Sequence, residues 1–390
     1  MGKKSKQNKQ IQNSNFDSYP LVSICTPTFN RRPFISTMIK CIQNQTYPKE
    51  KMEWIIVDDG TDKIGDLLQN IPNIPTVKYF PLNEKLTLGK KRNFTHSKCE
   101  GSFIVYIDDD DYYPPERISH AVETLQANRN ALCAGSSEIY VYFKHIQAMY
   151  KAGPYGPNHA TAGTFAFRKE LLSKTQYNES ASLAEEREFL KNYTIPFVQL
   201  DPMKTILVFS HNHNTFDKRK LLDNKTNNQQ LFQICTKVVN DFIRNASESD
   251  IKKFFLHDID DILEKYKYGD PIMKPDVLKQ IKQIEAQREA MKQQNVQTMI
   301  QEKGKPQRPL TMVEIAELLK RSQAENTELK KRLSFQTQGD SNTTIIEQQA
   351  KKLNVLESLV AKLREEIKAL QTNTSTVLCK SMPEVAVALV

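Results

Sequence analysis

Short apolar runs alternate with amphipathic segments through the first half of this chain of 390 residues, and no other feature restricts the fold as strongly. Four runs have the length of buried strands: Leu21–Cys25, Trp54–Val57, Val77–Phe80 and Phe103–Ile107. After the first run, Pro33 opens a segment with apolar residues at helical spacing: Ile35, Met38, Ile39 and Ile42. Strands that alternate with helices build a mostly parallel sheet. We therefore predict an α/β fold.

The same pattern continues beyond the fourth run. A basic helix is expected to begin near Gly89, and a second helix to begin at Pro114-Pro115-Glu116. Further strands are predicted at Glu138–Phe143, Gly163–Phe167 and Thr205–Phe209, and further helices at about Leu183–Leu190 and Leu231–Ile243. Open α/β sheets bind ligands at the carboxyl ends of their strands. The polar residues at those ends are therefore the candidate site residues: Thr26–Asn30, Asp58–Asp59, Asp108–Asp111 and His211–Asn214.

The last third of the chain has a different composition, dominated by Lys, Glu, Gln, Leu and Ile. Two sets of apolar residues repeat there every seven positions: Leu353, Val360 and Ile367, and three residues behind each of them Leu356, Leu363 and Leu370. Leu at d with mostly β-branched residues at a favours a parallel dimer. A single amphipathic helix folded back on the rest of the chain is the alternative.

Charge and cysteine content narrow the function classes. The net charge of +9 is dispersed, and no basic stripe with interleaved aromatic residues indicates nucleic-acid binding. The run Lys218-Arg219-Lys220 is expected to be solvated surface charge. Six cysteines without a C-x-x-C pair are expected to be reduced thiols. No stretch approaches the length of a membrane span, so we expect no integral membrane segment and a cytoplasmic protein.

Four consecutive aspartates follow the fourth apolar run, in the string VYIDDDDYYPP. Adjacent carboxylates repel one another unless a cation or hydrogen-bond donors compensate them. On an extended segment Asp108 and Asp110 point the same way, and one or two carboxylates together with substrate phosphates typically hold Mg²⁺ or Mn²⁺. A second acidic pair, Asp58 and Asp59 in IIVDDGT, has carboxylates that can accept hydrogen bonds from a base or ribose. An acidic turn that caps a helix is the alternative for the first cluster.

These strings occur in a specific order: TPTFNRR after the first strand, VDDGT after the second, GKKRN opening a helix, IDDDDYYPP, and an acidic pair on a later helix. Together they resemble the family 2 glycosyltransferases of GT-A fold, over roughly residues 20 to 215. The resemblance implies donor-site roles for the residues that match its motifs. They are Thr26, Pro27 and Asn30 at the nucleoside, Asp58 with Asp59 at the base or ribose, Arg92 facing the nucleotide, and Asp108 with its neighbours Asp109 and Asp110 at the diphosphate.

The resemblance also implies a metal and a general base. The D-x-D pair maps onto Asp108 and Asp110, with Mn²⁺ or Mg²⁺ bridging to the donor diphosphate. A histidine often supplies a third ligand, and His211 is preferred here over His213; the alternative is that both cap the loop or contact phosphates. In LAEEREFL, Glu186 takes the place of the base and Glu185 is its neighbour. The family usually has Glu-Asp there, and a surface helix rich in Glu is the alternative.

The expected organisation has five parts: a basic disordered tail at 1–18, a GT-A glycosyltransferase domain at 19–245, a helical linker at 246–310, a coiled coil at 311–372 and a flexible tail at 373–390. The expected function is metal-dependent, inverting transfer of a sugar, from a UDP-sugar or similar donor, to an acceptor hydroxyl on an unidentified glycan or protein. The expected assembly is a homodimer through the coiled coil.

Two other functions compete with this one. A sugar nucleotidyltransferase would normally begin with a glycine-rich phosphate loop, and TPTFNRR contains no glycine. A catalytically degenerate head that only binds a nucleotide sugar, carried on a coiled-coil scaffold, is the second alternative, and the complete acidic set speaks against it.

Overall fold

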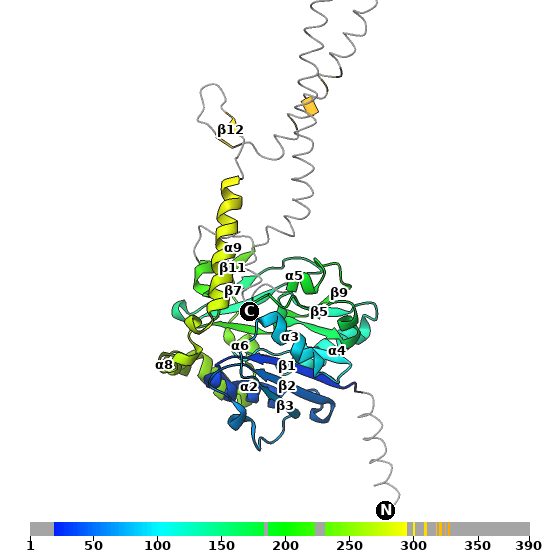
Figure 1. Ribbon diagram of the computed structural model, residues 1–390, viewed down its shortest axis with the longest axis vertical. Coiled ribbons are helices and arrows are strands. Elements are labelled where there is room, and N and C mark those ends of the chain that lie inside the picture. The colour runs from blue at the N-terminus through cyan, green and yellow to red at the C-terminus, as the bar shows by residue number, and fades with distance from the viewer. Residues whose placement is uncertain are drawn as a thin grey trace, which may run out of the picture. The chain divides into compact units, whose positions relative to one another are not determined.

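A computed structural model describes residues 19–182, 186–222 and 231–294, together with short stretches and single positions between 299 and 327 (Figure 1). The chain divides into two compact units, the first ending at Gln283 and the second beginning at Ile284. All the predicted site residues that the structure describes belong to the first unit.

The centre of the first unit is a seven-stranded sheet with the order β3-β2-β1-β4-β8-β5-β9. Four of its strands are parallel neighbours: β1 (Val22–Thr28), β2 (Met52–Asp58), β3 (Thr76–Pro81) and β4 (Phe103–Tyr106). β8 (Ala166–Arg168) runs antiparallel to both of its neighbours, β4 and β5 (Cys133–Gly135), and β9 (Phe197–Gln199) is parallel to β5. The α/β prediction and its four leading strands are thus confirmed.

Both faces of this sheet are buried because its strands alternate apolar residues to either side. Ile24, Trp54 and Ile56 join one apolar layer with α2 (Arg32–Asn44) and α4 (Arg117–Ala127). Cys25, Ile55 and Val57, one residue away from these, join the other layer together with Phe189 of α5 (Glu186–Phe189) and Phe94 of α3 (Leu88–Ser97). The period of two in the strands therefore places α2 and α4 on one side and α3 and α5 on the other.

A second, four-stranded sheet has the order β10-β6-β7-β11. It contains β6 (Ile139–Phe143), β7 (Ala148–Ala152), β10 (Leu207–Ser210) and β11 (Phe232–Ile234). The short helices α6 (Val239–Phe242), α7 (Ser249–Lys253) and α8 (Ile259–Lys265) share an apolar cluster with it, in which the rings of Phe209 and Phe255 stack at 4.0 Å. Because Phe255 and Leu263 are buried there, the first unit extends past residue 245, the boundary expected from the sequence.

Two predicted elements differ from the structure, and a third is described only in part. The helix predicted at Leu231–Ile243 is wrong: β11 pairs antiparallel with β7, and only the short α6 follows it. The strand predicted at Gly163–Phe167 begins only at Ala166, because a 3-10 turn forms over Ala162–Thr164. The helix predicted at about Leu183–Leu190 is described from Glu186 onward. In the first case, pairing of Phe232–Ile234 with β7 overrides the local pattern.

The remaining predicted parts lie mainly outside the described residues. These are the basic tail at 1–18, the tail at 373–390, and almost all of the coiled coil at 311–372. α9 (Pro275–Gln294) begins in the first unit, and the second unit contains an antiparallel pair, β12 (Met299–Ile300) and β13 (Arg308–Pro309). Within the described residues, every helix is too short or too polar to span a bilayer.

Candidate active site

The strand order creates a topological switch point between the carboxyl ends of β1 and β4, which we call the crevice. The chain passes outward from β1 to β2 and β3 and then crosses back to β4 on the other side of β1. At such a switch point the two loops leave their strands in opposite directions, and ligands of open α/β sheets bind between them. The loops that border the crevice are Phe29–Arg31 after β1 and Ile107–Asp111 after β4.

Arg31 holds the first carboxylates of the crevice together. Its guanidinium Nη2 lies 3.1 Å from Asp110 Oδ2, and its Nε lies 3.5 Å from Asp109 Oδ1. The same side chain donates from Nη1 to the backbone oxygen of His213, at 2.8 Å. His211 Nε2 lies 3.5 Å from Asp110 Oδ2. Loops that follow β1, β4 and β10 thus meet around Asp110.

The three consecutive aspartates of the crevice titrate differently. Burial opposes ionisation of Asp110, but Arg31 and His211 hold its pKa well below its usual range. Asp109 is buried beside the Asp110 charge, and its pKa is raised to about 7 although Arg31 lowers it. Burial and the Asp110 charge also raise the pKa of Asp111. Carboxylates whose environments separate their pKa values in this way are typical of functional sites.

The segment after β10 supplies a further cation. Lys218 is only 4% exposed, and burial lowers its pKa while the charges of Asp111 and Asp110 raise it. The expectation that the whole Lys218-Arg219-Lys220 run is solvated is therefore wrong for its first residue. Asp111 Oδ1 accepts the backbone N–H of Phe209 at 3.0 Å, which ties the acidic loop to β10.

Asp58 and Asp59, at the end of β2, are engaged by nearby backbone and side chains. The Asp58 carboxylate accepts hydrogen bonds from Gly60 N at 3.0 Å, Ile64 N at 3.1 Å and the Tyr79 hydroxyl at 2.7 Å. Asp59 accepts the backbone N–H of Leu86 at 2.7 Å and forms a buried ion pair with Lys91. The acidic pair therefore shapes the wall of the crevice at β2.

Asn30 joins three segments across the opening of the crevice. Its backbone is left-handed, with φ 52°, a conformation that Asn tolerates better than most residues. Its Oδ1 accepts the Asp62 backbone N–H at 2.9 Å, and its Nδ2 donates to the Tyr268 backbone oxygen at 2.9 Å. The segment around Tyr268 thereby lies against the first loop.

Thr26 and Pro27 belong to β1 itself. The Thr26 hydroxyl donates to the Ile107 backbone oxygen at 2.7 Å and accepts from Trp54 Nε1 at 2.9 Å, so it bonds within the sheet. Pro27 is partly buried beside it. Thr26 therefore sets the relative positions of β1, β2 and the end of β4.

Arg92 lies on the other side of the sheet from α2, on α3. Its guanidinium is 4.4 Å from the centre of the Tyr106 ring and 5.7 Å from that of Tyr177, within the range of cation–π contacts. Tyr106 is the last residue of β4, two positions before Asp108. Arg92 thus brings a buried positive charge near the acidic loop.

Glu186, the first residue of α5, is 3% exposed, and its Oε1 accepts the backbone N–H of Ala162 at 3.1 Å. The next residue, Gly163, accepts at its backbone oxygen from the Tyr113 hydroxyl at 3.2 Å. The same hydroxyl accepts the backbone N–H of Asp108 at 2.9 Å. Tyr113 therefore links the turn that holds Glu186 to the start of the acidic loop. Glu185 lies outside the described residues.

The donor atoms of this region fit a hard divalent cation, although the described residues contain no arrangement of three or more His, Cys, Asp or Glu side chains that meets metal-binding geometry. Asp110 Oδ2 and His211 Nε2 come from two elements and lie 3.5 Å apart. In the described part of the chain, the buried Asp111 Oδ2 has no hydrogen-bond partner. Carboxylate oxygen and imidazole nitrogen are ligands that Mn²⁺ accepts.

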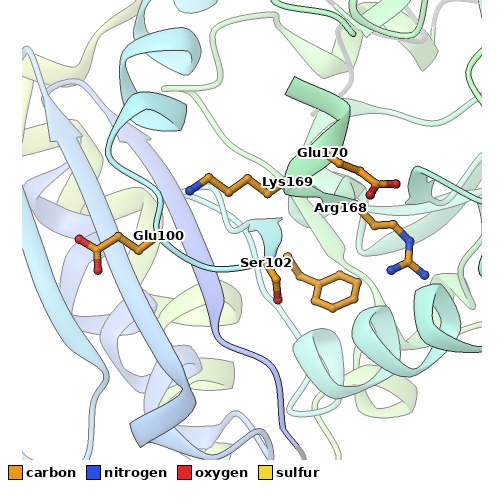
Figure 2. Close-up of a pocket in the computed structure, with 6 residues that line it drawn as sticks. Glu100, Ser102, Arg168, Lys169 and Glu170 are labelled. Carbon is orange, nitrogen blue, oxygen red and sulfur yellow. The ribbon is translucent and has the colours of Figure 1, made fainter. Parts of the chain in front are cut away.

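A separate hollow of about 550 Å³ lies at the opposite end of the sheet (Figure 2). It is lined by Glu100, Ser102, Phe103, Arg168, Lys169 and Glu170. Its cations already bond to backbone: Arg168 donates to the Ala131 and Leu125 oxygens, and Lys169 donates to the Cys99 oxygen. The hollow sits where β4 begins, so the residues at the carboxyl ends of the strands, not those of the hollow, form the candidate site.

Sequence reasoning missed two cations of the crevice, Arg31 and Lys218. Arg31 was visible in the TPTFNRR string, but its neighbour Arg32 pairs instead with Asp62 and Asp66 at the surface. Nothing local distinguishes the two arginines before the fold is known. The sequence signal for Lys218 was only its place shortly after His211 and His213.

A protein-family model, Glycosyl transferase family 2, matches residues 23–183 of the chain. One curated relative, the poly(ribitol-phosphate) beta-N-acetylglucosaminyltransferase TarS of Staphylococcus aureus, is 30% identical over 110 residues, which cover 28% of this chain and 19% of the relative. Another, the GalNAc(5)-diNAcBac-PP-undecaprenol beta-1,3-glucosyltransferase of Campylobacter jejuni, is 34% identical over 115 residues, covering 28% and 35%. The chain thus matches well under half the length of either relative.

Solved structures resemble the chain more loosely. The structure of S. aureus TarS 1–349 in complex with UDP-GlcNAc has a TM-score of 0.38 at 19% identity and covers 49% of this chain and 59% of that one. The mannosyltransferase PcManGT from Pyrobaculum calidifontis, in complex with GDP-Man and Mn2+, has a TM-score of 0.40 at 16% identity and covers 49% and 57%. These scores are low, and the assignment rests on the sequence match. The sequence match to glycosyltransferase family 2 thus covers residues 23–183, less than half of the chain.

Proposed function

We propose that the protein transfers a sugar from a nucleotide-diphosphate sugar to an acceptor hydroxyl, with inversion at the anomeric carbon. The observation that carries this proposal is the meeting of Asp109, Asp110, Arg31 and His211 at the switch point of a family 2 domain. Relatives that match the chain in sequence are named as sugar transferases, and one of them, TarS, was solved with UDP-GlcNAc bound. A UDP-sugar is therefore the proposed donor.

The crevice offers groups for each part of such a donor. The wall that Asp58 and Asp59 shape, together with Asn30 and Pro27, would receive the base and ribose. The cations at the other side, Arg31 and Arg92, would offset the charge of the diphosphate. Charge-assisted hydrogen bonds of this kind are stronger than those between neutral groups.

Asp108, Asp110 and His211 are the residues that would hold Mn²⁺ or Mg²⁺. When bound, such an ion neutralises the diphosphate as it leaves. Asp108 belongs to this set because it lies in the same loop as Asp110, and the Tyr113 hydroxyl holds its backbone N–H. Arg31 keeps Asp110 ionised, which any cation at this position requires.

Glu186 is the proposed general base. It would accept the proton of the acceptor hydroxyl as the acceptor oxygen bonds to the anomeric carbon and the bond from that carbon to the diphosphate breaks. Its burial and its bond to the Ala162 backbone hold the carboxylate in one orientation, as general base catalysis requires. The acceptor, a glycan or a protein, approaches from the side of this turn in the proposal.

Titration calorimetry with UDP-, GDP- and CMP-sugars, with and without Mn²⁺, tests the proposal, with donor hydrolysis followed in parallel. Metal-dependent binding of one nucleotide sugar together with slow hydrolysis is the expected result. Binding without hydrolysis in the presence of candidate glycan acceptors would favour the degenerate scaffold. Absence of any nucleotide binding would contradict the proposal.

The assembly is proposed separately. The heptads in 311–372 would join two chains in a parallel coiled coil. Removal of the residues after about 310 is expected to leave the first unit folded but monomeric in sedimentation analysis. A truncated chain that stays dimeric would show that another surface assembles the protein.

A further inference from the structure

A segment outside the family match closes over the loops of the crevice. We define the C-terminal strap as residues Tyr266–Gln280, which follow α8 and include the start of α9. The family match ends at residue 183. The strap therefore lies outside the residues that the family model matches.

The first half of the strap contacts the loops after β1 and β2. The Tyr268 backbone oxygen accepts from Asn30 Nδ2 at 2.9 Å, and the Tyr266 hydroxyl donates to Asp62 Oδ2 at 2.8 Å. At Gly269 the approach is so close that an added Cβ would lie 2.6 Å from His213 Nδ1 and 2.8 Å from the Asn30 backbone oxygen. Only a glycine fits at this point without displacing the strap.

The second half of the strap reaches the segments at the start of α3 and before α5. Asp276 pairs with Lys85 at 2.5 Å and accepts from the Ser182 hydroxyl at 2.9 Å. Gln280 Oε1 accepts the Ser182 backbone N–H at 3.0 Å, and its Nε2 donates to the Ser180 backbone oxygen at 2.9 Å. Both ends of the strap are thus fixed across the opening of the crevice.

Lys274 lies between these two attachments and faces the acidic loop. Its Nζ donates to the Thr215 hydroxyl at 2.8 Å and lies 5.9 Å from the centre of the Phe29 ring. Burial and the neighbouring Arg31 charge lower its pKa to about 7, while Asp109 and Asp110 act in the opposite direction. Arg31 and Lys91 are both in ion pairs, whereas the bond of Lys274 is to a neutral hydroxyl.

We propose that Lys274 binds the diphosphate of the nucleotide donor, and that the C-terminal strap holds it in place for this role. The proposal rests on the function proposed above. A diphosphate brings negative charge next to the Lys274 amine and favours its protonated form, and an exchange of the Thr215 hydroxyl for a phosphate oxygen gives the resulting ammonium a charged acceptor. The strap would thereby extend the donor site beyond the family domain.

Calorimetry with UDP, UMP and uridine in the presence of Mg²⁺, on the full chain, tests this assignment. Lys274→Met is expected to weaken UDP binding by about 10-fold to 100-fold, the scale of one lost charge-assisted hydrogen bond, and to leave uridine binding within about twofold. Lys274→Arg is expected to recover most of the UDP affinity. Lys267→Met, an exposed lysine of the same strap, is the matched control and is expected to bind UDP as the parent does.

Two outcomes overturn the proposal in distinguishable ways. If the parent protein binds UDP and Lys274→Met binds it equally well at an unchanged melting temperature, the proposed function stands but Lys274 does not bind the diphosphate. Parent protein that binds neither UDP nor GDP would remove both. An equal loss of UDP and uridine affinity in Lys274→Met would show that the residue only holds the strap, and would also overturn the diphosphate role.

Discussion

Both ends of the seven-stranded sheet carry charged side chains, but the two ends use them differently. At the carboxyl ends of the strands, Asp109, Asp110 and Arg31 are buried against one another, and the environment raises the pKa of Asp109 and lowers the pKa of Asp110. At the amino end, Arg168 and Lys169 donate to backbone oxygens around a hollow that opens to solvent. Charged side chains that donate to backbone oxygens stabilise the fold. Buried charged side chains that lie against one another, with shifted pKa values, are typical of a ligand site.

The largest effect is expected at Glu186, which bonds to the turn that Tyr113 connects to the acidic loop. Glu186→Gln should keep the side-chain shape and the bond to the Ala162 N–H, but it removes the proton acceptor. Transfer is expected to fall by about 10²-fold or more with donor binding unchanged, the usual scale for a lost general base. Lys169→Met, at the opposite end of the sheet, is the control and should keep full transfer. Unchanged turnover in Glu186→Gln would point to another base.

The next effect is expected at the centre of the crevice. Asp110→Asn removes the carboxylate that Arg31 and His211 share. Mn²⁺-dependent nucleotide binding is expected to weaken by at least about tenfold, because a metal ligand and its charge are lost together. Calorimetry with and without Mn²⁺ measures this. A variant that binds metal and nucleotide as the parent does would show that Asp110 is not a ligand.

A smaller effect is expected from the strap. Gly269→Ala adds a Cβ that would lie 2.8 Å from the Asn30 backbone oxygen, so the strap must shift away from the first loop. Donor affinity is expected to fall by about tenfold, the loss expected when one charge-assisted bond is misplaced. The Tm should change little, since few residues of the strap are in the core. If protease cleaves the strap of Gly269→Ala and the donor still binds tightly, the strap does not contribute to the donor site.

The last effect concerns stability, in the apolar layer between the two ends. Burial, assisted by the Arg92 charge, lowers the pKa of His96 to about 3, and its Nε2 lies 2.6 Å from the Tyr106 hydroxyl. The unfolded chain binds a proton at His96 below about pH 6.5, and the folded protein does not. The stability from this residue is therefore present above about pH 6.5 and is lost as the pH falls towards 3.

Between pH 7 and pH 5 this loss amounts to about 2 kcal/mol in the free energy of unfolding. Urea titrations of the parent and of His96→Gln, which removes the titrating ring, measure it as a difference in pH dependence. The exposed His257→Gln is the control and should follow the parent. A parent and a His96→Gln variant with equal pH dependence would contradict the assignment.

Local pattern predicted the parts of the fold whose burial repeats with a regular period. Ile24, Trp54 and Val105 lie in strands that the apolar runs indicated, and Ile118 and Leu125 lie on the apolar face of a predicted helix. The segment Phe232–Ile234 was predicted as helix but forms a strand. The prediction failed because its partner, the edge of β7, is about 80 residues away in the sequence. Such pairing leaves no periodic signal in a run of three residues.

The same contrast holds for the site. The acidic loop and the first-strand string predicted the resemblance to the family from their order alone, and the family match covers both. Nothing in the order predicts that Arg31 rather than Arg32 meets Asp110, or that Thr26 bonds within the sheet. The direction of a side chain depends on how each loop leaves its strand, and only the packed sheet decides that.

The amino-acid sequence by itself determined the alternation of strands and helices, the position of the acidic residues at strand ends, and the resemblance to the family, because these follow from local spacing. The tertiary structure alone decided which cations face the carboxylates and that a segment ending at Gln280 returns to cover the first loop. Contacts such as Asn30 with Tyr268 join residues far apart in the chain. Their formation depends on the sum of many packing interactions, and no local pattern encodes that sum.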